Sequence, residues 1–115
     1  MKIDKNLIGG SAILLVLTLL NEKDMYGYQI IKEIEERSDS TFQFKEGSLY
    51  PVLHKLKNNG YVKSYTAKGD TGKNRKYYQI TLVGQKHLKA QEEQWKLFSV
   101  SVNKVLGGSA HVYAQ

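Results

Sequence analysis

The chain has 115 residues, enough for one compact domain, and its lack of cysteine excludes disulfides, thiolate catalysis and cysteine-ligated zinc. It carries 17 lysines and arginines against 11 acidic residues, a formal net charge of +6, which favours polyanionic partners. Charge alone does not separate nucleic acid from anionic lipid or an acidic protein, so the order of the structural elements has to decide.

The first predicted helix covers residues 5–20 and is apolar on nearly every side from Ile13 onward. This pattern indicates a helix covered on two faces, one of them by a partner chain. The most apolar run, residues 12–20, has nine residues, whereas a membrane span needs about 20 and a signal sequence begins with basic residues. We therefore expect a buried helix in a cytoplasmic protein that has no membrane partner.

The second predicted helix covers residues 26–37, with an isoleucine face toward the core and a lysine and glutamate face toward water. A short polar linker at residues 21–25 precedes it. After this helix, residues 38–40 break the periodicity, and residues 41–44 alternate polar and aromatic side chains as a brief extended segment would. We expect this segment to lead directly into a third helix.

The third predicted helix has one apolar stripe at the spacing i, i+3, i+4 and i+7, formed by Leu49, Val52, Leu53 and Leu56. Ser48 is its expected N-cap, Pro51 falls in the expected first turn, and the Asn-Asn-Gly sequence at residues 58–60 ends it. Because the stripe faces the core, the opposite face is free to bind a partner.

A hairpin is predicted from two segments, residues 61–66 and 76–81, that are rich in tyrosine, valine, threonine and isoleucine. Gly69 and Gly72 lie between them, at a basic turn. Residues 45–80, which include the third helix and this hairpin, hold eight lysines and arginines but only two acidic residues. This segment alone carries the whole net charge of the chain, as expected of a nucleic-acid-binding surface.

A last long helix can be capped by Thr81, and its side chains repeat with alternating spacings of three and four. The members of this seam are Leu88, Gln91, Trp95, Phe98, Val102 and Val105. A heptad seam of about two and a half heptads suits packing against a copy of itself, which predicts a homodimer. Gly107 and Gly108 end the helix, and residues 108–115 form a tail without periodicity that we expect to be mobile.

Two consecutive helices followed by a hairpin are typical of a winged helix-turn-helix, in which one helix enters the major groove and the wing touches the backbone or minor groove. The residues that we assign to DNA are Ser48, Tyr50, His54 and Lys55 on the third helix and Lys68, Lys73, Asn74, Arg75 and Lys76 at the wing. Two alternatives remain open. The helix residues could be only the solvated face of an amphipathic helix, and the wing lysines could only protect an edge hairpin from aggregation.

Trp95 is the only tryptophan and falls on the predicted seam, where two copies would approach each other. It either packs in a dimer core or, paired with its copy, forms a stacking clamp for a flat aromatic ligand. Gln91 and Glu92 add polar groups that a dry core disfavours, and the small residues Ser11 and Ala12 leave room. These neighbours favour a ligand pocket.

Enzymatic and metal-dependent functions find no support in the sequence. The three histidines are scattered over the third helix, the last helix and the tail, without a second metal-ligand type at usable spacing. GDTGK at residues 69–73 lacks the spacing of a phosphate-binding loop, and no nucleophile has a base near it at a recognisable spacing. We therefore predict no catalytic residue, no metal and no cofactor.

Three segments resemble the PadR family of bacterial transcriptional regulators in order and spacing: YGYQI at residues 26–30, GSLYPVLHKLKNNGYV at 47–62 and NRKYYQIT at 74–81. The single last helix is similar to that of the short subfamily. The resemblance implies a mostly α-helical fold with a small β-hairpin, in which a winged helix-turn-helix DNA-binding domain at residues 1–80 precedes a C-terminal dimerisation helix at 81–107. It also implies repression that is relieved by small molecules such as phenolic acids or drugs.

The resemblance also implies roles for individual residues. It places Tyr50, His54 and Lys55 on the recognition helix and Lys73, Arg75 and Lys76 in the wing. In short members that sense multidrug compounds, a tryptophan from each C-terminal helix lines a pore at the dimer centre, and Trp95 occupies the matching position. Its neighbours would be Leu88, Gln91, Glu92, Ser11, Ala12 and Leu15.

The chain departs from the family pattern in two places. TLVGQK at residues 81–86 lacks the acidic residue that usually precedes the glycine, which affects helix capping. Leu15, Val16 and Phe98 could fill the dimer centre with apolar bulk, which would close the pore and leave only a structural dimer.

The leading hypothesis is a ligand-responsive homodimeric repressor that binds a palindromic operator in double-stranded DNA, with a planar aromatic drug or a phenolic acid as inducer. The alternative is a winged-helix interaction module that contacts protein or anionic lipid through its basic hairpin. Salt-sensitive binding to a defined duplex would exclude this alternative. A small enzyme with an unrecognised site is the third class, and flat activity screens with intact DNA binding would dismiss it.

Overall fold

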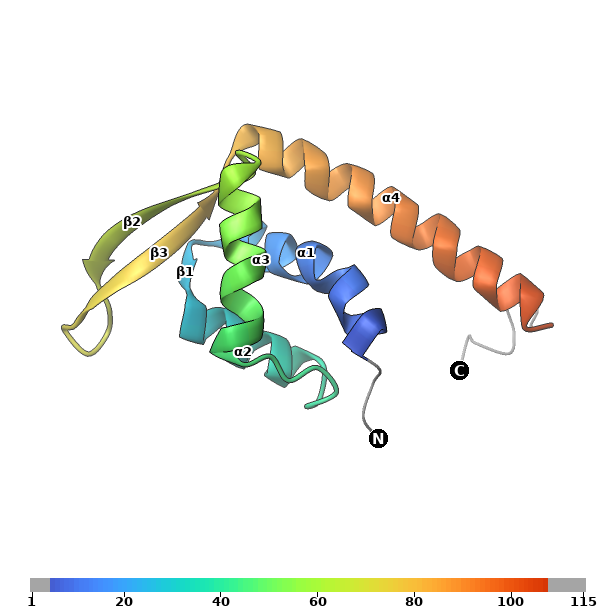
Figure 1. The fold of residues 1–115 in the computed structure, drawn as a ribbon, viewed down its shortest axis with the longest axis horizontal. Helices are drawn as coiled ribbons and strands as arrows, with labels where there is room; N and C mark the ends of the chain where they lie inside the picture. The colour runs from blue at the N-terminus through green and yellow to red at the C-terminus, as the bar shows by residue number, and fades with distance from the viewer. Residues whose placement is uncertain (1–4, 108–115) are drawn as a thin grey trace.

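The computed structural model describes residues 5–107, with side chains described from Gly10 onward. Within this range lie the helices α1 (Lys5–Glu22), α2 (Gly27–Arg37), α3 (Glu46–Asn58) and α4 (Leu82–Val105), and the strands β1 (Met25–Tyr26), β2 (Val62–Lys68) and β3 (Asn74–Ile80). Figure 1 shows the hairpin on one side of α3 and the long helix α4 on the other. The predicted mostly α-helical fold with a wing is confirmed. The tail predicted at residues 108–115 lies outside the described residues.

The core is built around α1, which contacts α2, α3, α4 and β3. Val16 and Leu17 of α1 are fully buried, and the other side chains buried to the same degree are Leu20, Met25, Ile30, Leu49, Leu53 and Leu56. Each buried leucine or isoleucine contributes about 1.5–3 kcal/mol to stability. The predicted apolar stripe of α3 therefore faces the core, with Val52 half-buried beside it.

The sheet has three antiparallel strands in the order β1-β3-β2. β2 and β3 form the predicted hairpin, in register from Val62 opposite Ile80 to Lys68 opposite Asn74, so both strands extend closer to the turn than predicted. β1 was not predicted, because residues 21–25 read as a linker. A two-residue strand is too short to show alternation, and it forms because β3 offers its free edge.

The segment between α2 and α3, for which a brief extended piece was predicted at residues 41–44, contains no strand paired to the sheet. Its alternating aromatic residues pack on the core. Phe44 is buried in the core and Phe42 is half-buried against it, so the two rings anchor a loop. Asp39 and Ser40, which precede them, have positive φ angles of 50° and 65°, and this conformation turns the chain back toward α3.

α3 begins earlier than predicted. Lys45 is the N-cap residue and no side chain caps the helix, so the assignment of Ser48 as N-cap was wrong. The Ser48 amide already donates to the Lys45 carbonyl oxygen at 2.9 Å, which places Ser48 within the first turn. Pro51 consequently lies inside the helix and not in its first turn. Its ring removes the amide hydrogen that would bond the carbonyl of Gly47, which is exposed to water.

The start of α4 is fixed against the root of the hairpin. The Thr81 hydroxyl accepts a hydrogen bond from the Gly84 amide at 3.0 Å, as predicted for a cap, and donates to the Gly60 carbonyl oxygen at 2.6 Å. At Gly84 a Cβ atom would collide with the carbonyl oxygen of Tyr61. The His87 ring stacks on the Tyr61 ring with centroids 4.1 Å apart. The glycine is therefore required because helix and strand approach so closely here.

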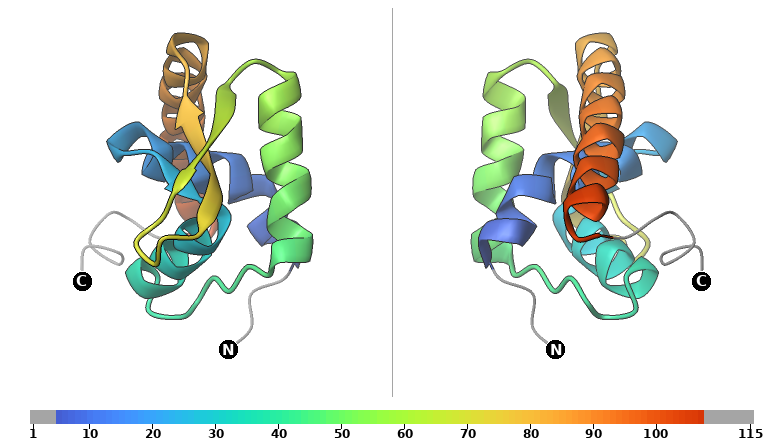
Figure 2. Two further views of the ribbon diagram at one scale, coloured as in Figure 1. Left: turned by 90° about the vertical axis from the view of Figure 1, so that its left-hand side faces the viewer. Right: turned by 90° about the vertical axis from the view of Figure 1, so that its right-hand side faces the viewer.

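The distal half of α4 projects away from the rest of the molecule. Figure 1 places its far end and the wing at opposite ends of the long axis, and Figure 2 views the molecule from those two ends. Only Gly84 and Leu88 of α4 are buried. The exposed large apolar side chains beyond them are Trp95, Leu97, Phe98, Val100, Val102 and Val105. Among the described residues, no helix combines the length and apolarity needed to cross a membrane.

Candidate nucleic-acid interface and interhelical pocket

The exposed face of α3 carries the side chains that the sequence assigned to DNA. Ser48, Tyr50, His54 and Lys55 are all exposed. A Cβ atom on Gly27, at the start of α2, would lie 3.3 Å from the Tyr50 hydroxyl, so the absent side chain leaves room for the phenol. Tyr50 is thus positioned against α2 although 47% of it is exposed. This packing orients Tyr50 and reduces the conformational entropy that its side chain loses when a partner binds.

The wing carries the second group of predicted residues. Lys68, Lys73, Asn74 and Lys76 are exposed along the hairpin. The turn is closed by the Gly69 amide, which donates to the Lys73 carbonyl oxygen at 2.8 Å. Gly72 adopts a φ of +83°, a conformation that other residues rarely adopt. The cations therefore lie on a regular hairpin, Lys73 at its turn and Lys68 and Lys76 on its strands.

Arg75 is placed differently from the wing lysines. It is half-buried, and its guanidinium lies 5.1 Å from the centroid of the Tyr26 ring in β1. Its Nε atom is buried without a hydrogen-bond partner. Side chains alternate along a strand, so Arg75 shares a face of the sheet with Tyr77, whereas Lys76 points to the opposite face. Arg75 braces the wing against β1.

Tyrosines on the Arg75 face tie the wing to the end of α1. The Tyr65 and Tyr77 rings stack with centroids 5.6 Å apart, and Tyr26 packs edge-on against Tyr77 at 5.4 Å. The Tyr65 hydroxyl donates to Asp24 Oδ2 at 2.6 Å, and this hydrogen bond raises the pKa of Tyr65. The Gln79 amide donates to the same oxygen at 3.2 Å. Asp24 therefore anchors both wing strands, a role the sequence did not predict.

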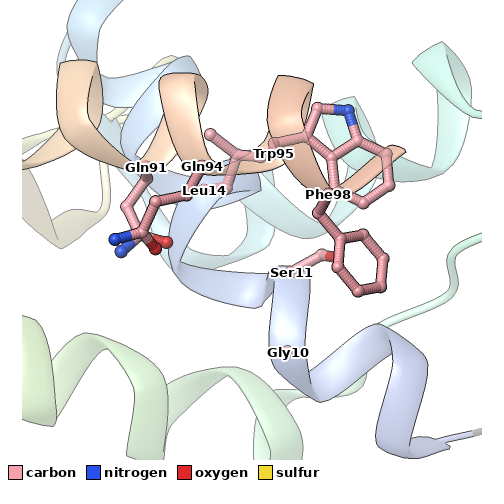
Figure 3. A pocket seen from close by; sticks show the side chains of 7 residues that line it. All are labelled: Gly10, Ser11, Leu14, Gln91, Gln94, Trp95 and Phe98. Carbon is pink, nitrogen blue, oxygen red and sulfur yellow. The ribbon is translucent and has the colours of Figure 1, made fainter. Parts of the chain in front are cut away.

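A pocket of about 340 Å³ lies between α1 and α4. It is lined by Gly10, Ser11, Leu14, Gln91, Gln94, Trp95 and Phe98. Figure 3 shows the two glutamine amides together at one end and the two aromatic rings at the other. The Trp95 and Phe98 rings are 5.9 Å apart at an interplanar angle of 29°. None of the described side chains that line this pocket is charged, so this lining suits a ligand with a flat apolar part and a neutral polar group.

Three of the seven predicted ligand residues, Ser11, Gln91 and Trp95, line this pocket. Ala12 and Leu88 are buried in the core and do not reach it, and Glu92 is exposed on α4 but is not part of the lining. Leu15 lines a separate hollow between α1 and α2. The physical reason is the rotation of α1, which turns Ala12 and Val16 inward.

Four residues that line the pocket were not among the predicted ligand residues: Gly10, Leu14, Gln94 and Phe98, although Phe98 was predicted on the same seam as Trp95. On α4 they could have been found, because Gln91, Gln94, Trp95 and Phe98 recur at i, i+3, i+4 and i+7 and so share one face. On α1 no such signal exists, since this helix is apolar on almost every side. Within the described part of the chain, no group of three histidine or acidic side chains is arranged to hold a metal ion.

Comparison with known proteins identifies relatives of the whole fold. Residues 16–90 match the transcriptional regulator PadR-like family. The structure of a transcriptional regulator from Clostridium thermocellum has a TM-score of 0.80 and 39% identity, covering 89% of this chain and 96% of that one. A PadR family transcription regulator from Clostridium difficile has a TM-score of 0.74 and 33% identity, covering 84% and 99%. An uncharacterised protein X of Lysinibacillus sphaericus is 37% identical over 90 residues, which are 78% of this chain and 83% of the relative.

Proposed function

Because the chain belongs to the PadR-like family of transcriptional regulators, we propose that it is a homodimeric repressor, released from its operator by a small planar aromatic ligand. The family consists of DNA-binding regulators and not of enzymes. One observation carries the proposal for this chain: the exposed face of α3 and the basic wing meet on one surface, where Tyr50 and His54 of α3 line the same hollow as Lys76 of β3.

The DNA-binding half of the proposal assigns separate tasks to helix and wing. α3 would enter the major groove, where Tyr50, His54 and Lys55 face the base edges. Lys68, Lys73 and Lys76 would contact phosphates, which adds affinity for any sequence and makes binding sensitive to salt. In support of this division, Tyr50 packs against Gly27 of α2, whereas the wing lysines are exposed along the hairpin.

The dimer is supported by the distal half of α4. On its seam, Phe98 is 56% exposed, Val102 37% and Val105 86%, and no part of the described chain covers this apolar surface. Exposed apolar surface of this extent on a single helix is unusual for a monomer. A second copy of α4 would cover it, and the two recognition helices would then be available for two half-sites of a palindrome. Binding to such an operator would take place in the cytoplasm.

The ligand-binding half of the proposal rests on the pocket between α1 and α4. Trp95 and Phe98 offer ring faces for stacking, while Gln91 and Gln94 offer amide groups that both donate and accept hydrogen bonds. A ligand wedged between the two helices would change their separation. Because α4 continues directly from β3, this change would alter the position of the wing.

DNase footprinting on the intergenic DNA upstream of the protein's own gene tests the proposal. We expect protection of two inverted half-sites with centres about one helical turn, roughly 34–36 Å, apart. A planar neutral aromatic compound that quenches Trp95 should abolish the footprint. A missing footprint together with saturable binding to anionic lipid vesicles would favour the alternative, an interaction module that docks through its basic hairpin.

A further inference from the structure

A second, polar hollow of about 430 Å³ lies between α3 and β3. Its lining residues are Tyr50, Leu53, His54, Lys57, Asn58, Lys76 and Tyr78. Most of these side chains carry a group that can donate a hydrogen bond, and none is acidic. The hollow is separate from the pocket between α1 and α4, with which it shares no residue.

The shape of the hollow follows from two periodicities. The α3 residues recur at positions 50, 53, 54, 57 and 58, the spacing that places side chains on one helical face. Lys76 and Tyr78 are two apart on β3, so both point from the sheet toward that face. Leu53 is fully buried and Tyr78 is 5% exposed, whereas Lys57 and Lys76 are exposed. The buried side chains of Leu53 and Tyr78 therefore form the base of the hollow, and the two lysines lie at its exposed edge.

The chemistry of the lining fits an anion with several acceptor oxygens. Lys57 and Lys76 each bring an ammonium group, and His54 and Asn58 add further nitrogen donors. Burial and the neighbouring Tyr50 raise the pKa of Tyr78, so its hydroxyl stays neutral and able to donate. The Lys76 ammonium lies 5.9 Å from the centroid of the Tyr78 ring, which holds this cation beside the base of the hollow. A phosphate group has the charge and the acceptor oxygens that these donors need.

The expected path of DNA across a winged helix passes over this hollow. If α3 lies in a major groove and the wing reaches the next minor groove, the phosphate strand that separates the two grooves has to pass between α3 and β3. We propose that the hollow binds one phosphodiester of this strand through Lys57 and Lys76, with help from Asn58 and Tyr78. The inference rests on the proposed DNA binding and adds Lys57, Asn58 and Tyr78 to it.

Salt titrations of three variants test the shared phosphate. Lys57→Gln and Lys76→Gln should each reduce the slope of log K against log salt by about 1 on both operator and random duplex. The double variant should reduce the slope no further, because both lysines hold the same phosphate. Lys89→Gln, which removes an exposed lysine from α4, is the matched control and should leave the slope unchanged. Equal slopes for Lys57→Gln and Lys89→Gln would overturn the inference.

A scan with single neutral methylphosphonates along the operator locates the proposed phosphate contact. At one position per half-site, a methylphosphonate should weaken binding of the wild-type protein but should not weaken binding of Lys57→Gln any further. If every methylphosphonate weakened binding of Lys57→Gln as much as it weakens binding of the wild-type protein, the proposed phosphate contact in the hollow would be contradicted. Binding of inorganic phosphate seen in His54 NMR shifts, without any methylphosphonate effect, would assign the hollow to a free ion and overturn the DNA assignment. A wild-type protein that binds no duplex would overturn the proposed function, and this inference with it.

Discussion

The wing and the distal half of α4, which lie at opposite ends of the molecule (Figure 1), differ in what supports them. The wing is braced within one chain, by the Tyr65–Asp24 hydrogen bond and by Arg75 against Tyr26. The distal half of α4 has no such support, because its large apolar side chains are exposed. A single chain thus forms both the surface proposed for DNA and the pocket between α1 and α4, whereas the apolar surface proposed for dimerisation is left for a second copy to cover.

The largest effect is expected where the two regions are joined. Gly84→Ala places a Cβ atom against the backbone oxygen of Tyr61, which cannot move without displacing β2. We expect a loss of about 3 kcal/mol in the free energy of unfolding, measured by urea denaturation. Gly47→Ala is the control, because a Cβ there meets no heavy atom within 4 Å. It should be neutral or stabilise α3 by up to about 1 kcal/mol. Equal effects of both variants would show that the joint is not tightly packed.

The next two variants test whether operator binding and ligand binding depend on different parts of the molecule. Tyr50→Ala should weaken operator binding by about 1–3 kcal/mol, since it removes a positioned side chain from the recognition helix, and should leave ligand binding intact. Trp95→Ala should abolish ligand binding, measured by calorimetry, with operator affinity largely retained. Loss of the dimer in Trp95→Ala would instead identify Trp95 as core packing. Equal losses of Tyr50→Ala on operator and random DNA would show that Tyr50 does not read bases.

The sequence predicts those features of the two regions whose patterns lie within a few neighbouring residues, and it does not predict contacts between residues that are distant in sequence. The α3 stripe and the Thr81 cap were predictable, because their patterns lie within a few consecutive residues. The anchoring role of Asp24 was not, since its partners Tyr65 and Gln79 are more than 40 positions away. The difference between Arg75 and Lys76 was not predicted either, because the predicted strand began at Lys76, whereas β3 begins at Asn74 and so includes Arg75.

The pocket between α1 and α4 shows the same limit. Trp95 and Gln91 could be placed from the period of α4. The choice between Leu14 and Leu15 on α1 could not, because a helix that is apolar all round does not reveal which side faces its neighbour. Only the packing of α1 against the rest of the chain places Leu14 at the pocket and Leu15 at the hollow beside α2.

A smaller effect tests the internal support of the wing. Tyr65→Phe removes the hydrogen bond to Asp24 and keeps the ring that stacks on Tyr77. We expect a stability loss of about 1 kcal/mol, with faster amide hydrogen exchange in β2 and β3 than in α3. Tyr28→Phe, at an exposed tyrosine of α2, is the control. Unchanged exchange in the wing of Tyr65→Phe would mean that Asp24 does not hold it.

The smallest effect concerns the exposed ion pair between α1 and α2. The Arg37 guanidinium donates to both oxygens of Glu22, at 2.8 and 2.6 Å, and lowers the pKa of Glu22 below its usual 4.5. A lowered carboxylate pKa stabilises the fold above the unfolded pKa, and this contribution disappears as the pH falls through the folded value. Thermal unfolding between neutral pH and pH 3 should therefore be slightly less pH-dependent in Glu22→Gln. An identical pH profile would mean that the pair contributes nothing, as many exposed pairs do.

Fluorescence anisotropy of a labelled upstream duplex and of a scrambled duplex of equal length, titrated at several salt concentrations, tests the central claim most directly. We predict that the operator binds more tightly than the scrambled duplex by a factor on the order of 10³ or more. Both affinities should fall steeply with salt, because the wing lysines release counterions. Equal affinity for the two duplexes, or binding that does not respond to salt, would contradict the assignment of α3 and the wing to operator DNA.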